Sequence, residues 1–158
     1  MEIRQETDGE RKGFIARRIL EGLPEWFGIP ESREAYIRES RDQLFFCAYR
    51  EGEPVGFLCL KETGKDTAEL AVMGVLAPLH RQGIGRELFL AAKRFATESG
   101  YSFLQVKTVQ MGKYENYDRT NRFYLSLGFR EFEVFPDLWD PWNPCQVYVM
   151  SLKTSGTV

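Results

Sequence analysis

Residues 79–88, LHRQGIGREL, place Gly83 and Gly85 where an apolar strand-like run gives way to a helical pattern. Glycines at such a point let the backbone approach a ligand closely, and the first turn of a helix leaves its N–H groups without intrahelical acceptors. Those donors and the positive end of the helix dipole form an anion site that suits a pyrophosphate. Arg81 and Arg86 add positive charge that can pair with phosphate oxygens.

Two nucleotide-binding motifs are excluded in this segment. The chain has no G-x-x-x-x-G-K-[ST] loop, and Leu88 stands where G-x-G-x-x-G requires its third glycine. A helix cap after a turn can also show Gly-x-Gly, so the glycines alone do not identify the ligand.

A wider stretch, residues 68–90, resembles motif A of the GNAT superfamily of acetyltransferases, whose pattern is Q/R-x-x-G-x-G/A. The pattern falls on residues 80–85, and His80 stands in the Gln or Arg position. We interpret His80 as a turn residue. Residues 121–130, NRFYLSLGFR, are similar to motif B of that superfamily. The resemblance covers about residues 44–152 and implies the GNAT fold and acetyl-CoA as cosubstrate. The sequence has no CxxC pair and one histidine, which argues against a metal site.

The resemblance also implies which residues contact the coenzyme. Backbone amides of the glycine turn would bind the pyrophosphate, and the strand at 69–76, with a bulge at Gly74, would pair with the pantetheine arm. The Met73 N–H would face the thioester carbonyl. The family's asparagine position falls on Tyr117, so Asn116 (alternatively a helix N-cap) or Asn121 would take its place. The implied contacts are Met73, Val75, Arg81, Gln82, Gly83, Ile84, Gly85, Arg86, Asn116 and Asn121.

Two residues are candidates for acid–base catalysis. Glu69 precedes Gly83 by fourteen residues (83 − 69), which is the spacing of the catalytic glutamate in GNAT histone acetyltransferases. It would remove a proton from the amine; alternatively it is a solvated glutamate at a strand end. Tyr124 holds the motif B tyrosine position and would protonate the leaving thiolate, because a phenol in water has a pKa of about 10. Alternatively, Tyr124 is a core aromatic.

The resemblance places the acceptor near residues 23–36 and residues 135–144. Aromatic rings with carboxylates nearby suit a cationic amine; alternatively, these residues only pack a proline-rich loop onto the sheet. The candidate substrate-binding residues are Trp26, Phe27, Tyr36, Trp139 and Trp142, with negative charge from Glu25, Asp137 and Asp140.

Periodicity and turn residues predict the elements that position these groups. Strands are expected at 2–6, 44–49, 55–60, 67–76, 102–109, 129–135 and 145–152, and helices at 9–22, 31–40, 84–98 and 117–127. Ser32 is expected to cap the second helix, and 23–30 to form a loop. The fold class is α/β or α+β, with a mostly antiparallel sheet of six to seven strands, one parallel pair and about four helices.

Composition supports one globular domain of 158 residues with 43% hydrophobic and 28% charged residues. Within it, residues 1–43 would form the acceptor side, 44–100 the coenzyme-binding part and 101–152 the C-terminal part. A net charge of −2 argues against a nucleic-acid partner, and no apolar stretch predicts a membrane span. Cys47 and Cys59 lie in apolar runs, which predicts reduced thiols and a cytoplasmic protein.

The expected function is therefore transfer of acetyl from acetyl-CoA to a primary amine. The acceptor is a small molecule, or alternatively a peptide or protein amine. A non-catalytic acyl-CoA sensor is the other alternative, and the presence of both Glu69 and Tyr124 favours an enzyme. The sequence leaves a homodimer open.

Overall fold

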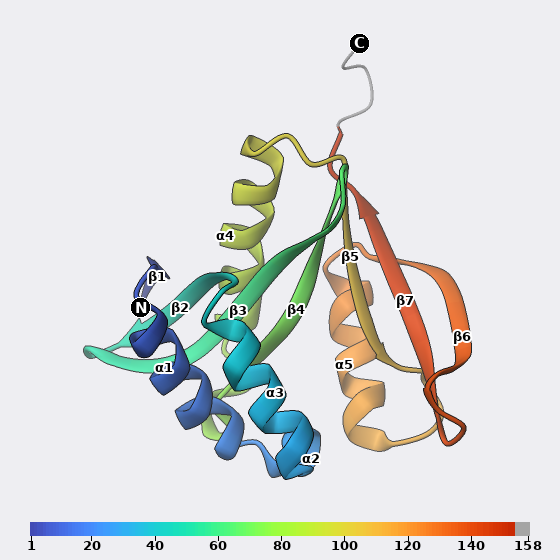
Figure 1. The fold of residues 1–158 in the computed structure, drawn as a ribbon, viewed down its shortest axis with the longest axis horizontal. Helices are drawn as coiled ribbons and strands as arrows, with labels where there is room; N and C mark the ends of the chain where they lie inside the picture. Colours follow the sequence, from blue (N-terminus) through green and yellow to red (C-terminus); the bar gives the residue numbers. More distant parts are fainter. Residues whose placement is uncertain (154–158) are drawn as a thin grey trace. The chain divides into compact units, whose positions relative to one another are not determined.

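The computed structural model describes residues 1–153, which fall into two compact units. The first unit comprises residues 1–61 and 70–95, and the second comprises residues 62–69 and the chain from 96 onward. Each unit has its own helices and strands (Figure 1). No helix within residues 1–153 is long and apolar enough to cross a membrane.

The first unit contains the N-terminal helices and the first strands. Its elements are β1 (Glu2–Glu6), α1 (Gly9–Glu21), α2 (Pro24–Phe27), α3 (Pro30–Ser40), β2 (Leu44–Arg50), most of β3 (Glu53–Gly64) and of β4 (Thr67–Val75), the 3-10 turn η1 (Ala77–Leu79) and most of α4 (Ile84–Glu98).

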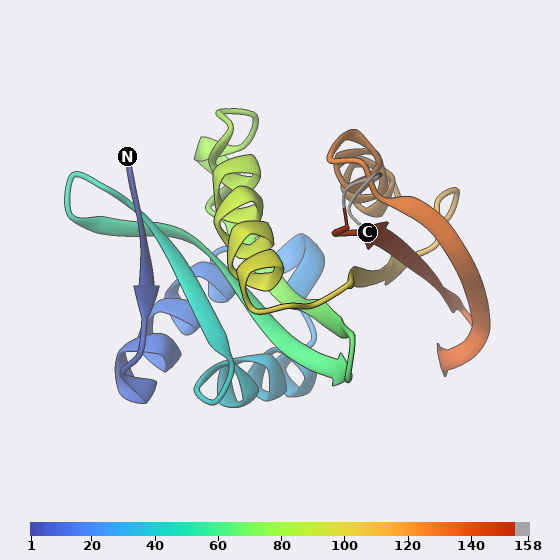
Figure 2. The same cartoon turned by 90° about the horizontal axis from the view of Figure 1, so that it is seen from above.

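The core of the first unit lies between α1 and the strands. Buried Ile15 and Ile19 of α1 pack with Phe45 of β2 and Phe57 of β3, whose rings stack at 5.1 Å. Figure 2 shows α1 and α3 on one face of these strands and α4 on the other. The sheet of this unit is therefore covered on both faces, which explains the continuous apolar run in β2.

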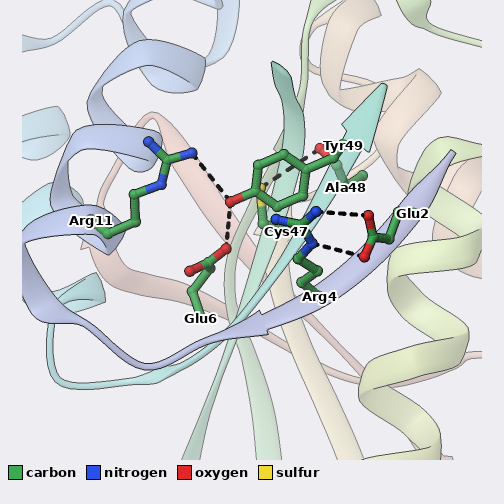
Figure 3. Close-up of polar contacts among 7 residues, drawn as sticks. All are labelled: Glu2, Arg4, Glu6, Arg11, Cys47, Ala48 and Tyr49. Carbon is green, nitrogen blue, oxygen red and sulfur yellow. Dashed lines mark hydrogen bonds and ion pairs between the residues drawn. The ribbon is translucent and has the colours of Figure 1, made fainter. Parts of the chain in front are cut away.

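Tyr49 at the end of β2 ties β1 and α1 together (Figure 3). Its buried hydroxyl donates to the Glu6 carboxylate and accepts from Arg11 Nη2 at 3.4 Å, while Arg4 lies over its ring at 4.6 Å. Burial, and then the hydrogen bond to Glu6, raise the pKa of Tyr49 to about 12. The N-terminal strand is thus held by polar as well as apolar contacts.

The second unit contains the C-terminal elements. They are the end of β3, the start of β4, the end of α4, β5 (Phe103–Val109), α5 (Glu115–Ser126), β6 (Arg130–Asp140) and β7 (Asn143–Ser151). β7 pairs antiparallel with both β5 and β6. Asn121 fastens α5 to this sheet, because its amide donates to Val109 O at 2.8 Å and accepts from Tyr148 Oη at 2.6 Å.

The expected fold class is confirmed: within residues 1–153, seven strands follow the order β1-β2-β3-β4-β5-β7-β6, with five α-helices. Neighbouring β4 and β5 are joined through α4, as a parallel pair requires, and the other neighbours are antiparallel hairpins or ladders. The 84–98 helix has the predicted bounds, and Gly100 after it has a φ of 90°.

Four local predictions were wrong. Residues 24–27 form α2, because Pro24 fits the first turn of a helix. The N-cap of α3 is Ile29 and not Ser32, since Pro30 already begins the helix. α5 begins at Glu115, so Asn116 lies inside it and does not cap it. The last two strands continue to a two-residue turn, which places Trp139 in β6.

Candidate functional site

The glycine turn, residues 80–86, follows η1 in the first unit and includes the first residues of α4. Arg81 and Gly83 have φ values of 65° and 82°, whereas Gln82 between them does not have a positive φ. Turns of this kind can direct successive backbone N–H groups to one side, as in anion-binding nests, and α4 begins directly after Gly83. A Cβ added at Gly83 would meet no heavy atom of the described residues within 4 Å. The turn therefore has both the donors and the open space that a phosphate group needs.

Side chains of the turn divide into one anchor and several exposed groups. Ile84 is 1% exposed and fixes the start of α4 in the core, whereas Arg81, Gln82 and Arg86 are exposed. Gln82 Oε1 accepts from Arg50 Nη1 at 2.8 Å. Arg50 comes from the end of β2, where the sequence indicated only a turn, so its proximity to the glycine turn was missed.

His80 connects the turn to the end of β4 and to α2. Its Nε2 lies 2.6 Å from Val75 O, and its ring meets Trp26 edge-on at 5.7 Å. This agrees with the interpretation of His80 as a turn residue. The predicted pantetheine contact of the Val75 backbone stays a prediction.

Gly74 has a packing reason in the structure. A Cβ at this position would lie 2.9 Å from Leu23 Cδ1 and 3.0 Å from Ile19 Cγ2, closer than real side chains come. The glycine thus lets β4 lie directly against α1 and the residue that precedes α2. The bulge expected at Gly74 stays a prediction, as does the orientation of the Met73 N–H.

Glu69 lies in the second unit within a polar cluster that we call the Glu69 cluster: Glu69, Gln105 and Lys107. Lys107 Nζ is 3.0 Å and Gln105 Nε2 is 2.9 Å from the same oxygen, Glu69 Oε1. Only 7% of the Glu69 side chain is exposed. The alternative of a solvated strand-end glutamate therefore does not describe this residue. Sequence reasoning found Glu69 but missed both of its partners.

Tyr124 lies on the buried side of α5, with 7% of its surface exposed. Its ring centroid is 5.9 Å from that of Phe129 and 6.3 Å from that of Tyr148. These contacts fix the ring in the second unit and agree with its interpretation as a core aromatic. They do not test the catalytic role, which remains a prediction.

The two candidate asparagines differ in their surroundings. Asn121 is fully buried, and its amide also donates to Tyr117 O at 2.7 Å, in addition to the bonds with Val109 and Tyr148. These bonds give Asn121 a role in holding α5. Asn116 lies in the first turn of α5, where its carbonyl accepts from Thr120 Oγ1 at 3.2 Å.

The predicted acceptor residues form separate groups in the two units. Trp26, Phe27 and Tyr36 pack against the core of the first unit, and Phe27 meets Tyr36 edge-on at 5.7 Å. In the second unit Trp139 is 45% and Trp142 is 75% exposed.

Asp140 shapes the turn between β6 and β7. Its Oδ1 accepts from the backbone N–H groups of Trp142 and Asn143, both at 2.9 Å. The Asn143 amide first, and these backbone donors next, hold the pKa of Asp140 below its usual value. Asp140 therefore has a structural role that the sequence did not indicate.

A separate groove of about 520 Å³ lies between α1 and α3 in the first unit. Its lining contains none of the predicted site residues. It consists of Glu10, Gly13, Phe14, Arg17, Glu34, Ile37, Arg38 and Arg41.

Comparison with known proteins bears on the fold and the family. A protein from Desulfovibrio desulfuricans that is assigned to the GNAT family superposes with a TM-score of 0.84 at 19% identity, over 96% of this chain and 99% of that one. Ard1 from Thermoplasma volcanium superposes with a TM-score of 0.76 at 17% identity, over 97% of this chain and 98% of that one. An aminoglycoside 6'-N-acetyltransferase complexed with coenzyme A superposes with a TM-score of 0.72 at 16% identity, over 98% of both chains.

These identities show a shared fold only, and a search of curated protein sequences finds no significant match. The sequence model of the acetyltransferase (GNAT) family, however, matches residues 15–129, which include β2 to α5. The chain belongs to the acetyltransferase (GNAT) family.

Proposed function

We propose that this acyltransferase moves an acetyl group from acetyl-CoA to a primary amine, by direct attack while both substrates are bound. The observation that carries the proposal is the glycine turn, where two residues with positive φ and a helix start lie together at an open, basic surface. Arg81 and Arg86 lie in this turn, and their positive charges suit a pyrophosphate. The complex of a structural neighbour with coenzyme A supports this choice of ligand.

Coenzyme binding is assigned mainly to the backbone. N–H groups of residues 82–86 would donate to the pyrophosphate, with Arg81 and Arg86 supplying charge. The N–H groups of Met73 and Val75 would donate to the thioester carbonyl and the pantetheine arm. Of the two candidate asparagines, Asn116 is assigned the contact with the coenzyme. Bound acetyl-CoA supplies the activated acetyl group.

Glu69 is assigned the role of general base. An alkyl amine has a pKa of about 10 and is protonated at neutral pH, so it must lose a proton before it can attack. Glu69 takes that proton from the acceptor and returns it to solvent. The neutral nitrogen then forms the C–N bond as the C–S bond breaks.

Tyr124 is assigned the role of general acid. It gives its phenolic proton to the leaving sulfur and recovers one from the second proton that the acceptor nitrogen releases. The reaction therefore yields the amide, free thiol and one net proton. A phenol suits this role because its pKa in water exceeds that of a thiol.

We propose a small amine as the acceptor. Each unit taken by itself has aromatic surface, from Trp26, Phe27 and Tyr36 in the first and from Trp139 and Trp142 in the second. Such surface attracts cationic amines. One structural neighbour is an aminoglycoside N-acetyltransferase, and an aminoglycoside is a small amine.

The test is release of free thiol from acetyl-CoA in the presence of a panel of small amines and of peptides. We expect release with at least one small amine, with the acetylated product detected by mass spectrometry. The Gly83→Glu variant serves as the control and should release none. Release with peptides but with no small amine would contradict the assigned acceptor class.

A further inference from the structure

The Glu69 cluster contains a geometric detail that the proposed function does not use. Gln105 and Lys107 are separated by one residue in β5, so both side chains lie on the same face of that strand. Both donate to Oε1 of Glu69, at 2.9 and 3.0 Å. Gln105 Nε2 also donates to Thr63 Oγ1 at 3.1 Å, which holds the amide itself in place.

The charge of Lys107 matters because Glu69 is buried. A carboxylate that is 7% exposed needs a nearby cation to remain ionised inside a protein. Lys107 supplies this charge at one oxygen, and Gln105 fixes the orientation of the same oxygen. Removing either donor would therefore change the charge balance or the orientation of Glu69.

The cluster lies on the face of the second unit's sheet that α5 does not cover. Val106 is opposite Tyr148, whose hydroxyl bonds to Asn121 of α5, so these side chains point toward the helix. Lys107, the next residue after Val106, is opposite Val147 and points the other way. The Lys107 side chain is 33% exposed there, so solvent reaches the lysine side of the cluster.

We infer that Lys107 is a positioning residue for the reaction, acting through Glu69 together with Gln105. This inference rests on the proposed role of Glu69 as general base. Lys107 supplies the positive charge beside this buried carboxylate, and Gln105 orients the oxygen that both donors share.

The test is the pH dependence of kcat/KM for Lys107→Met, Lys107→Gln and Lys107→Arg. The neutral variants should lose on the order of tenfold activity at pH 6, because fewer molecules then have an ionised Glu69. The acidic limb of the profile should move to higher pH, and the loss should shrink as pH rises. Lys107→Arg keeps the charge and should restore most of the activity.

Lys65→Met is the matched control, since it removes an exposed positive charge from the same unit at the turn before β4. It should keep the wild-type profile. Lys107→Gln keeps a donor toward Glu69 and provides the measurement if Lys107→Met does not fold.

Glu69→Gln separates this inference from the proposed function. Suppose that Glu69→Gln folds but loses activity, and that the neutral Lys107 variants keep the wild-type pH profile. The inference about Lys107 is then wrong, and the proposed role of Glu69 as base survives. If Glu69→Gln itself is unchanged, both are wrong.

Discussion

The glycine turn and the Glu69 cluster use different parts of the polypeptide. The turn is built from consecutive residues, and its key features are backbone ones: two positive φ values and a helix start. The cluster is built from side chains 36 and 38 residues apart (105 − 69 and 107 − 69) that meet at one carboxylate oxygen. A variant in the turn should thus change coenzyme binding by filling the open space or altering the backbone. A variant in the cluster should change the reaction by altering the charge at Glu69.

The largest effect is expected for Gly83→Glu. The new side chain would fill the open space over the turn and place a negative charge where we expect a pyrophosphate. Loss of two charge-assisted hydrogen bonds would weaken binding by about 3–6 kcal/mol, or roughly 10²- to 10⁴-fold. Wild type should gain about 2.7 kcal/mol of stability at an acetyl-CoA concentration of 100 Kd, whereas Gly83→Glu should show no thermal shift.

Gly100→Glu is the matched control for this experiment. Gly100 follows the other end of α4, has a φ of 90° and likewise has no described heavy atom within 4 Å of an added Cβ. Both variants thus bear the same backbone strain, and Gly100→Glu should keep the shift. Equal thermal shifts in the two variants would show that the coenzyme does not bind at the glycine turn.

This contrast also explains what the sequence could predict. The turn was predictable because its glycines and arginines are neighbours in the chain, so the motif contains the site. The contacts of Lys107 and Gln105 with Glu69 were not predictable, because they depend on which strands pair and in which register. Arg50 was missed for the same reason: its contact with Gln82 spans 32 residues.

Elements were predicted where local periodicity is strong and missed where the local signal was ambiguous. The long amphipathic pattern of α4 gave its bounds. The prolines near residue 24 suggested a loop, although proline is also favoured in the first turn of a helix. The polar ends of β3 and β6 hid the full length of these strands, since pairing continues where apolar alternation stops.

Glu69→Gln tests whether the Glu69 cluster supplies the general base. The amide cannot take a proton, so kcat/KM at pH 7 should fall by roughly 10²- to 10⁴-fold, the usual contribution of a general base. Glu62→Gln is the control, because Glu62 is an exposed carboxylate of the same unit that accepts from Tyr101. A similar loss in both variants would show that the effect is not specific to Glu69.

Tyr124→Phe should have a smaller effect. The ring contacts with Phe129 and Tyr148 survive, and only the phenolic proton is lost. We expect kcat to fall by about tenfold or more, with little change in acetyl-CoA affinity. Tyr101→Phe removes an exposed hydroxyl from the same unit and should be silent. If Tyr124→Phe has wild-type kcat between pH 6 and 9, Tyr124 is a core aromatic only.

Tyr49→Phe should affect stability and leave catalysis unchanged. It removes the hydroxyl that joins Glu6 and Arg11 in the first unit. The free energy of unfolding, measured in urea, should fall by about 1–3 kcal/mol because a buried network loses its central partner. An unchanged unfolding free energy would mean that this network adds nothing to the fold.

The same hydroxyl predicts that the free energy of unfolding depends on pH in the alkaline range. The pKa of Tyr49 is about 12 in the folded chain and about 10 when unfolded. Its contribution is therefore complete below pH 10 and is lost as pH rises toward 12, by at most about 1.4 kcal/mol per pH unit. Tyr49→Phe should show a shallower decline, and an identical decline would contradict the assignment.

The most direct test is calorimetric titration of acetyl-CoA into wild type, Gly83→Glu and Glu69→Gln side by side. If the glycine turn binds the coenzyme and the Glu69 cluster serves the chemistry, wild type and Glu69→Gln should bind with the same Kd, and Gly83→Glu should bind roughly 10²- to 10⁴-fold more weakly. Absence of binding to wild type, or equal loss in both variants, would contradict this division of roles.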